Sequence, residues 1–338
     1  MKNRVLFRFP SITVIIATYN SEKTIRECLR SVRLQNYPQE KINILLADGG
    51  SIDKTFQIAE EFNVDIVSVP SELQNAEYNK GVAVRRATGE LLLMIDHDNV
   101  LPHDLWLINM VRPLLVEKDV VGVETLRYKH NPNASLLDRY FALFGGDPLS
   151  FYLGKLDRLS YLYTKYNLLG SAVDKGNYYI VNFKPNKIST LGANGFLIRR
   201  NLLMKHALVD ENHFFHIDVN VDLIKKGFNT YAFIKDDIVH LTGYRSLSSF
   251  LYRRKLFMEQ FHFRKYQSRR YSVFMPQDRF KLIVFIVYSV TFIKPTIDAL
   301  RGYLKIRDIA WFLHPFLCFS LLSIYGFVTI KRVLLKYG

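Results

Sequence analysis

Two carboxylates separated by one residue, Asp96 and Asp98, follow the most apolar short run in the first half of the chain. Residues 91–95 are all apolar, which predicts a strand buried on both faces. In an open α/β sheet, ligands bind just beyond the carboxyl ends of the strands. An Asp-x-Asp pair at that position suits one divalent cation, Mg²⁺ or Mn²⁺, held against the phosphates of a nucleotide. The same residues also suit an ordinary polar turn, so the neighbouring segments must decide between the two interpretations.

The composition favours a globular protein with a membrane-associated part. The chain has 338 residues, of which 49% are hydrophobic and 14% aromatic, and this length predicts two domains or one domain with an appendage. The net charge of +15 indicates an anionic partner, such as a phosphorylated substrate or anionic lipid. Cys28 and Cys318 are too few and too far apart for a disulfide framework. The first ten residues lack the apolar core of a signal peptide, so we expect the N-terminal part to lie in the cytosol.

Strands and helices are expected to alternate along the first hundred residues. β-branched or apolar runs predict strands within residues 11–20, 42–47, 64–69 and 91–95. Helical spacing predicts helices after Ser21, over 54–61 and over 75–87. This alternation is typical of an α/β protein with a mostly parallel sheet wound with helices.

Five short motifs in this region occur in the same order as in a known family. They are residues 14–20 (VIIATYN), 48–55 (DGGSIDKT), 79–81 (NKG), 87–90 (ATGE) and 96–98 (DHD). Together they make the chain similar to family 2 of the inverting glycosyltransferases, which have the GT-A fold. The resemblance covers the first 125 residues well and continues weakly to about residue 240. One departure is Gly49, because the family often has a second acid after the one that matches Asp48.

The resemblance implies roles for the residues at these strand ends, and their chemistry agrees. Asp48 can accept hydrogen bonds from a base or a ribose hydroxyl, and Lys80 lies next to the motif glycine. Asp98 would bind the cation, and Asp96 would face the ribose or share the cation. The expected nucleotide-sugar contacts are Thr18, Tyr19, Asn20, Asp48, Lys80 and Asp96.

Further along the chain, the resemblance implies a catalytic base. Family members carry an acid at the start of a helix that removes the proton of the acceptor hydroxyl, and Asp218 matches that position best. Asp222 and Asp210 are the alternatives. His240 ends the predicted strand 231–240 and is a candidate metal ligand, although a histidine at a strand end is more often structural.

The last hundred residues combine basic and apolar segments. Residues 241–281 contain ten basic and two acidic residues, interleaved with aromatic ones, which predicts basic amphipathic helices at anionic headgroups. Arg253 and Arg254 in this segment could contact an acceptor or a phosphate. Residues 309–330 contain one ionisable residue, His314, and are long enough to span a bilayer, whereas the apolar run 282–293 is short. We expect a membrane hairpin with both ends in the cytosol.

The sequence therefore predicts a catalytic domain over residues 1–240, an aromatic-rich insertion near 135–170, interfacial helices over 241–281 and membrane segments over 282–338. We expect a cell-membrane glycosyltransferase that uses a UDP- or GDP-sugar, Mg²⁺ or Mn²⁺, and a lipid-linked or membrane-proximal acceptor. No nucleic-acid-binding fold is indicated. The rival interpretations are a nucleotidyltransferase on a similar sheet and a non-catalytic membrane scaffold derived from a transferase.

Overall fold

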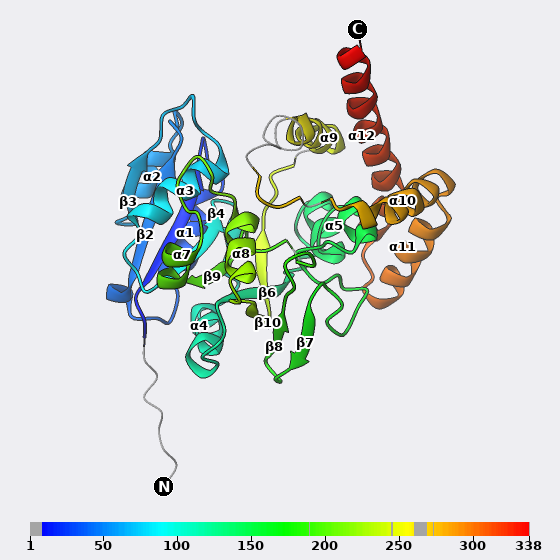
Figure 1. Cartoon of the computed structure of the whole chain (residues 1–338). Helices are drawn as coiled ribbons and strands as arrows, with labels where there is room; N and C mark the ends of the chain where they lie inside the picture. Colours follow the sequence, from blue (N-terminus) through cyan, green and yellow to red (C-terminus); the bar gives the residue numbers. More distant parts are fainter. Residues whose placement is uncertain (1–8, 189, 245, 260–268, 273, 338) are drawn as a thin grey trace. The chain divides into compact units, whose positions relative to one another are not determined.

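The computed structural model describes residues 9–188, 190–244, 246–259, 269–272 and 274–337. It divides into two compact units, whose helices and strands are labelled in Figure 1. Unit 1 comprises Met1–Leu126 and Gly170–Leu241, and unit 2 comprises Arg127–Leu169 and Thr242–Gly338. The aromatic-rich segment near 135–170 thus belongs to the same unit as the C-terminal helices.

The parallel part of the sheet holds the first four strands, in the order β3-β2-β1-β4. These strands are β1 (Ile12–Thr18), β2 (Ile42–Asp48), β3 (Asp65–Ser68) and β4 (Leu91–Asp96). All seven residues of β1 are buried, as are the five apolar residues of β4. The register pairs Thr18 with Asp48 and Ala17 with Asp96, so the polar residues that end the strands meet at one edge. We call this the carboxyl edge.

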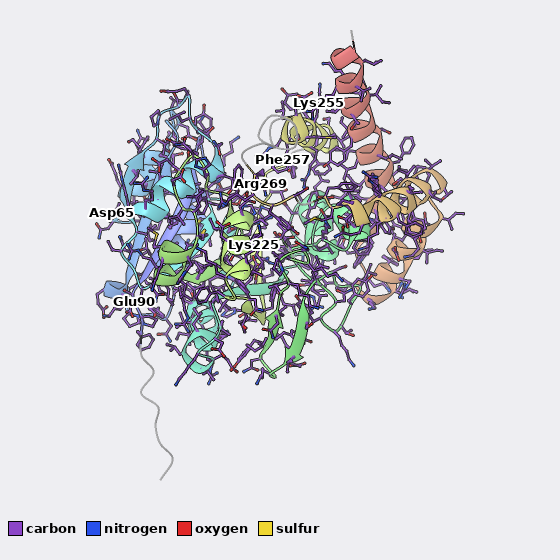
Figure 2. The ribbon with its side chains drawn as sticks, in the orientation of Figure 1. Asp65, Glu90, Lys225, Lys255, Phe257 and Arg269 are labelled. Carbon is purple, nitrogen blue, oxygen red and sulfur yellow. The ribbon has the colours of Figure 1, made fainter. Side chains whose placement is uncertain are left out.

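The Gly89-Glu90 motif fixes the opposite edge of the same strands. Glu90 accepts from the Ser11 backbone N–H at 3.2 Å, and its own N–H donates to the Ser11 hydroxyl at 3.0 Å. A Cβ at Gly89 would lie only 2.5 Å from the backbone nitrogen of Thr13, which requires glycine there. Figure 2 labels Glu90, which directly precedes β4, and separately Asp65, the first residue of β3. The motif therefore holds the start of β4 against β1.

The remaining strands extend the sheet as β9-β6-β10-β8-β7 after β4. Their bounds are β6 (Gly122–Tyr128), β7 (Ser171–Asp174), β8 (Tyr178–Asn182), β9 (Phe196–Arg199) and β10 (Thr230–His240). The short β5 (Asn99–Val100) pairs with the end of β10. The α/β fold class is confirmed. The parallel pairing predicted for the sheet holds for β1 to β4, whereas β9 pairs antiparallel with both β4 and β6, and β8 with both β7 and β10.

The helices of unit 1 connect these strands. They are α1 (Ile25–Arg33), the 3₁₀ turn η1 (Gln39–Lys41), α2 (Thr55–Glu60), α3 (Ala76–Arg86), α4 (Trp106–Val116), α7 (Arg200–His206) and α8 (His216–Lys225). The helix predicted over 75–87 is confirmed as α3. Asn75 caps it, because its side-chain oxygen accepts from the Tyr78 N–H at 3.0 Å.

Unit 2 is helical. Its elements are α5 (Leu136–Phe144), α6 (Pro148–Leu153), α9 (Leu247–Phe257), η4 (Pro276–Asp278), α10 (Arg279–Thr291), α11 (Ile293–Lys305), η5 (Ile309–Leu313) and α12 (His314–Tyr337). An aromatic core joins α5 to the C-terminal helices, with Phe144 4.8 Å from the Trp311 ring. Gly302 allows that ring to approach α11, because a Cβ there would lie 2.3 Å from it.

Among the described residues of unit 2, one helical stretch is long and apolar enough to cross a membrane. It is Ile309–Leu334, with 26 residues and a mean hydropathy of 1.7. The pair Pro276–Thr291 and Ile293–Lys305 meets the same criterion only when taken as one span, and it is bent by 81° at Phe292. At 1.5 Å per residue, the 13 residues of α10 extend about 20 Å, which is short of a bilayer core of about 30 Å.

Candidate active site

The loops after β1 and β2 are held together at the carboxyl edge. Asp48 accepts from the Thr18 hydroxyl at 2.9 Å, and from the backbone N–H groups of Gly50 and Ser51 at 2.9 and 2.7 Å. Asn20 adopts a left-handed conformation, with φ of 49°, and its side chain accepts from the Ile52 N–H at 3.0 Å. The two loops therefore form one preorganised surface.

The predicted nucleotide contacts differ in how much of their surface is available. Thr18 and Asp48 are buried and support the loops, whereas the Tyr19 side chain is 46% exposed. Tyr19 and Asn20 are therefore more available to a ligand than Thr18 and Asp48, whose carboxylate already accepts several hydrogen bonds, and the contact of Tyr19 with a base stays a prediction.

The departure at Gly49 has a steric reason. A Cβ at this position would lie 2.0 Å from Cγ of Gln74 and 3.2 Å from the side-chain nitrogen of Asn79. Asn79 is fully buried and donates to the backbone oxygen of Ala47 at 3.3 Å, so it cannot easily move away. An acid at position 49 does not fit this arrangement, and the contact made by the second acid of the family motif has no counterpart here.

A buried ion pair occupies the end of β4. The Lys80 ammonium lies 2.6 Å from Oδ1 of Asp96, and Lys80 is 1% exposed. Burial opposes the charge on Lys80, but Asp96 and Glu77 outweigh it and raise the pKa of the ammonium above its ordinary value. Lys80 and Asp96, both predicted from the sequence, thus meet, and each neutralises the other.

Asp98 lies beside His240, as the predicted metal site requires. Pairing of β5 with β10 aligns His240 with Asn99, and the Leu241 N–H donates to the Asp98 backbone oxygen at 2.9 Å. The nearer atoms of the two side chains, Oδ2 of Asp98 and Nε2 of His240, are 3.6 Å apart. Burial opposes ionisation of Asp98, but the imidazoles of His240 and His97 lower the pKa of the carboxyl.

The residues around Asp98 fit a divalent cation. Oδ1 of Asp98 is buried and has no hydrogen-bond partner in the part of the chain that the structure describes. A buried carboxylate oxygen without a partner is costly unless a ligand completes it. Carboxylate ligands suit Mg²⁺ and Mn²⁺, and neutral imidazole is a common metal ligand. Among the described residues, however, no three His, Cys, Asp or Glu side chains are grouped closely enough to form a complete metal site.

The first turn of α8 carries the predicted base. Asp218 is fully buried there. The two alternative acids both bind the segment before α8. Asp222 accepts from the Leu208 N–H at 3.1 Å, and Asp210 lies 2.7 Å from Nδ1 of His213.

Sequence reasoning missed a carboxylate–imidazole pair in this region. Glu77 of α3 accepts from the His216 backbone N–H at 2.9 Å and pairs with Nδ1 of the same residue at 2.5 Å. The spacing of Glu77 and Lys80 on one helix face was a signal available in the sequence, but their partner His216 is 139 residues from Glu77.

Arg253 and Arg254 belong to unit 2 and have partners within it. Arg253 donates to the Thr242 backbone oxygen at 3.4 Å and lies over the Tyr244 ring. Arg254 lies 3.6 Å from Asp147, and that carboxylate raises the pKa of the guanidinium although burial opposes it. These contacts show how α9 is held, and the acceptor role of both residues stays a prediction.

An α/β sheet that gathers carboxylates, a buried lysine and a histidine at its carboxyl edge is a nucleotide-binding type of architecture. The family model for glycosyl transferase family 2 matches residues 13–206, which is more than half of the chain. The chain belongs to that family.

Curated relatives match over short segments. Glycosyltransferase AglE of Haloferax volcanii is 34% identical over 103 residues, covering 29% of this chain and 33% of AglE. A Methanococcus voltae enzyme, named as a dolichyl N-acetylglucosaminyl phosphate diacetamido-glucuronosyltransferase, is 33% identical over 90 residues, covering 25% of this chain and 27% of that protein. The chain thus spans a third or less of the length of these relatives.

Among solved structures, the mannosyltransferase PcManGT of Pyrobaculum calidifontis, described in complex with GDP-Man and Mn²⁺, aligns at 19% identity with a TM-score of 0.46. The alignment covers 98% of this chain and 86% of that one.

Proposed function

We propose that this chain is an inverting glycosyltransferase that moves a sugar from a UDP- or GDP-sugar to a lipid-linked or membrane-proximal hydroxyl. The observation that carries the proposal is the pairing of Asp98 with His240 at the end of β4, where a buried carboxylate oxygen has no partner among the described residues. Family membership supplies the reaction class.

The donor would bind along the carboxyl edge. Tyr19 offers a face for the base, and the loop that holds Asn20 and Asp48 is fixed before the ligand arrives. Asp96 ends the neighbouring strand β4 and is partly exposed, so it can contact the ribose, while the buried Lys80 of α3 supports it from behind. A preorganised site of this kind loses little entropy on binding.

Asp98 and His240 would hold the divalent cation, with Asp96 as a further candidate. When bound, Mn²⁺ or Mg²⁺ neutralises charge on the departing nucleoside diphosphate. The acceptor would lose its proton to Asp218, in the first turn of α8. The acceptor oxygen attacks the anomeric carbon from the face opposite the leaving group, and the configuration inverts.

Three observations support a membrane-proximal acceptor. The stretch Ile309–Leu334 is long and apolar enough to span a bilayer, and α12 exposes Phe316, Phe319 and Phe327. A relative in Methanococcus voltae is named for a dolichyl-linked substrate. We infer that unit 1 lies on the cytoplasmic side of the cell membrane, because nucleotide sugars are made in the cytosol.

The proposal is tested by thermal shift of the full chain in detergent with UDP-GlcNAc, UDP-glucose and GDP-mannose, each with Mn²⁺ or with chelator. One nucleotide sugar should stabilise the wild type in the presence of Mn²⁺, and D98A should lose this effect. D65A is the matched control, because Asp65 is an exposed aspartate on the outermost strand β3, which β2 and β1 separate from β4. Equal stabilisation of D98A and wild type would contradict the metal site, and no stabilisation by any donor would favour the scaffold.

A further inference from the structure

We propose that helices α10, α11 and α12 lie in one leaflet of an anionic bilayer, and that the apolar stretch Ile309–Leu334 does not cross it. This arrangement replaces the membrane hairpin expected from the sequence. The inference rests on the membrane location proposed above, and it identifies the surface of unit 2 that contacts lipid.

Each of the three helices exposes one apolar stripe. Residues that recur every three, four or seven positions lie on one side of an α-helix. The exposed apolar residues with this spacing form what we call the lipid face: Phe280, Ile283, Val287 and Val290 of α10, Ile293, Ile297, Leu300 and Leu304 of α11, and Phe316, Phe319, Phe327 and Ile330 of α12. The opposite side of α12 is fully buried at His314, Leu317 and Leu321. The helix therefore has one side for protein and one for another apolar medium.

Ring contacts join the stripes into one surface. Phe292 lies between α10 and α11, and its ring is 6.4 Å from that of Phe316 and 5.6 Å from that of Phe319. Tyr303 of α11 lies 5.3 Å from Phe312, just before α12. A contiguous exposed apolar surface is typical of a site that binds a membrane or another protein.

The charges around the lipid face favour lipid. Residues 279–334 contain eight basic and two acidic residues. Both acids are buried, and Asp298 lies 2.5 Å from Lys294 while Asp308 lies 2.7 Å from His130. The exposed basic residues are Arg279, Lys281, Arg301, Lys305, Arg307 and Lys331. Basic residues around an apolar face match anionic headgroups, whereas a second copy of the chain would present the same positive charge.

The packing of α9 opposes a crossing of the bilayer by α12. Phe250 of α9 belongs to the aromatic core against which Tyr325 of α12 packs. Tyr325 lies 16 residues after the start of Ile309–Leu334 and nine before its end. Residues 253–255 of α9 are consecutive basic residues, of which Figure 2 labels Lys255. A crossing helix would carry these charges into the hydrocarbon core, which is costly.

A position within one leaflet accommodates all three helices. An amphipathic helix in the plane of the membrane inserts its apolar face about 5–10 Å into the boundary between headgroups and acyl chains. The 81° bend between α10 and α11 is compatible with this position, because both helices can lie at the same depth. The buried side of α12 then stays in unit 2, where His314 hydrogen-bonds to Tyr140 at 2.8 Å and to Tyr152 at 3.1 Å.

The sidedness of two engineered cysteines tests whether α12 crosses. R307C precedes the apolar residues 309–330 and K331C follows them, and both positions are exposed. Sealed inside-out vesicles from cells that make the full chain are treated with a membrane-impermeant maleimide, before and after permeabilisation. D65C marks the side of unit 1, and wild type is the blank, because Cys28 and Cys318 are buried.

The labelled fractions of R307C, K331C and D65C before permeabilisation should agree within about twofold, because all three sites lie on one side of the bilayer. Labelling of R307C before permeabilisation and of K331C only afterwards, or the reverse, would show that α12 crosses and would overturn the inference.

Flotation of the full chain with preformed liposomes tests the lipid face itself. V290D and I297D should each lower the fraction bound to phosphatidylglycerol liposomes by about fivefold or more, and liposomes of phosphatidylcholine alone should bind wild type less by a similar factor. L34D is the matched control, because Leu34 is an exposed leucine of unit 1. The variants should keep the wild-type Tm, because these side chains are exposed.

Unchanged flotation of V290D and I297D, or a wild type that does not float, would overturn the inference. A wild-type dimer in detergent that V290D dissociates, with flotation retained, would instead assign the surface to a second copy of the chain. Neither experiment uses a sugar nucleotide, so failure of the inference is distinguishable from failure of the proposed function, which the thermal-shift experiment measures.

Discussion

The buried pair of Lys80 and Asp96 makes a prediction that can be worked out from the structure. Substitution K80M keeps most of the side-chain length and removes the charge, so Asp96 loses the partner that lies 2.6 Å away. Removing one member of a buried pair costs more than its net interaction, because the remaining charge stays poorly solvated.

The expected cost follows from the burial of each partner. Breaking a fully buried pair costs about 3–5 kcal/mol. The Asp96 side chain is 27% exposed, so water compensates part of the loss, and we expect about 2–3 kcal/mol for K80M. For a unit of this size, each kcal/mol lowers Tm by about 2–4 °C, which gives a decrease of about 4–12 °C. D96N should cost more than K80M, because Lys80 is almost completely buried.

The assay is a double-mutant cycle of K80M, D96N and K80M/D96N, followed by chemical unfolding of the full chain in detergent. The double variant should be more stable than the sum of the two single effects predicts, by about 1–3 kcal/mol. K118M is the matched control, because Lys118 is exposed, and its effect should stay within about 0.5 kcal/mol. Additive single effects would refute the reasoning, because they would mean that the two side chains do not interact in solution.

Three further predictions follow from other contacts. The pKa of the Glu77 carboxyl is lowered from 4.5 to about 2 in the folded chain, so the ionised carboxylate adds about 3 kcal/mol of stability above pH 4.5. This stability is lost as the pH falls toward 2, and the acid unfolding curve of E77Q should lack this component. G89A should cost about 2 kcal/mol or more in urea unfolding, because the new methyl meets the Thr13 backbone. Aspartate at the exposed Phe319 and Phe327 should reduce flotation with liposomes of phosphatidylglycerol without lowering Tm.

The sequence predicted the parallel strands because their signal is local. The apolar run before Asp96 and the β-branched run before Thr18 each fill one buried strand, and the carboxyl-edge rule then brings their ends together. The pairing of Asp96 with Lys80 was not predicted, because Lys80 lies within helix α3 and not at the end of a strand. The antiparallel strands β7 and β8 were not predicted, because β7 is exposed along its whole length and carries no alternating apolar pattern.

The pairing of Glu77 with His216 was harder to predict for a physical reason. Asp218 was predicted from its place at the start of a helix, its burial could not be read from residue type, and its role as the base stays a prediction. The partner of His216 comes from a helix 139 residues earlier, and only the packing of α3 against the segment before α8 brings it near. Gly81 allows that close packing, because a Cβ there would lie 2.8 Å from Phe214. A glycine within a predicted helix indicates a close contact, but the sequence does not identify the residue that makes it.

The acids of the site differ in the groups that neutralise them. Asp96 gives Oδ1 to Lys80, and Glu77 gives both oxygens to His216, so these two acids already have cationic or hydrogen-bonding partners. Asp98 keeps one buried oxygen without a partner among the described residues. Because a cation binds most strongly where negative charge is least compensated, we propose that the metal binds Asp98, whereas Glu77 holds the start of α8 through His216. Lys80 interacts with both Asp96 and Glu77 and so links these two carboxylates electrostatically.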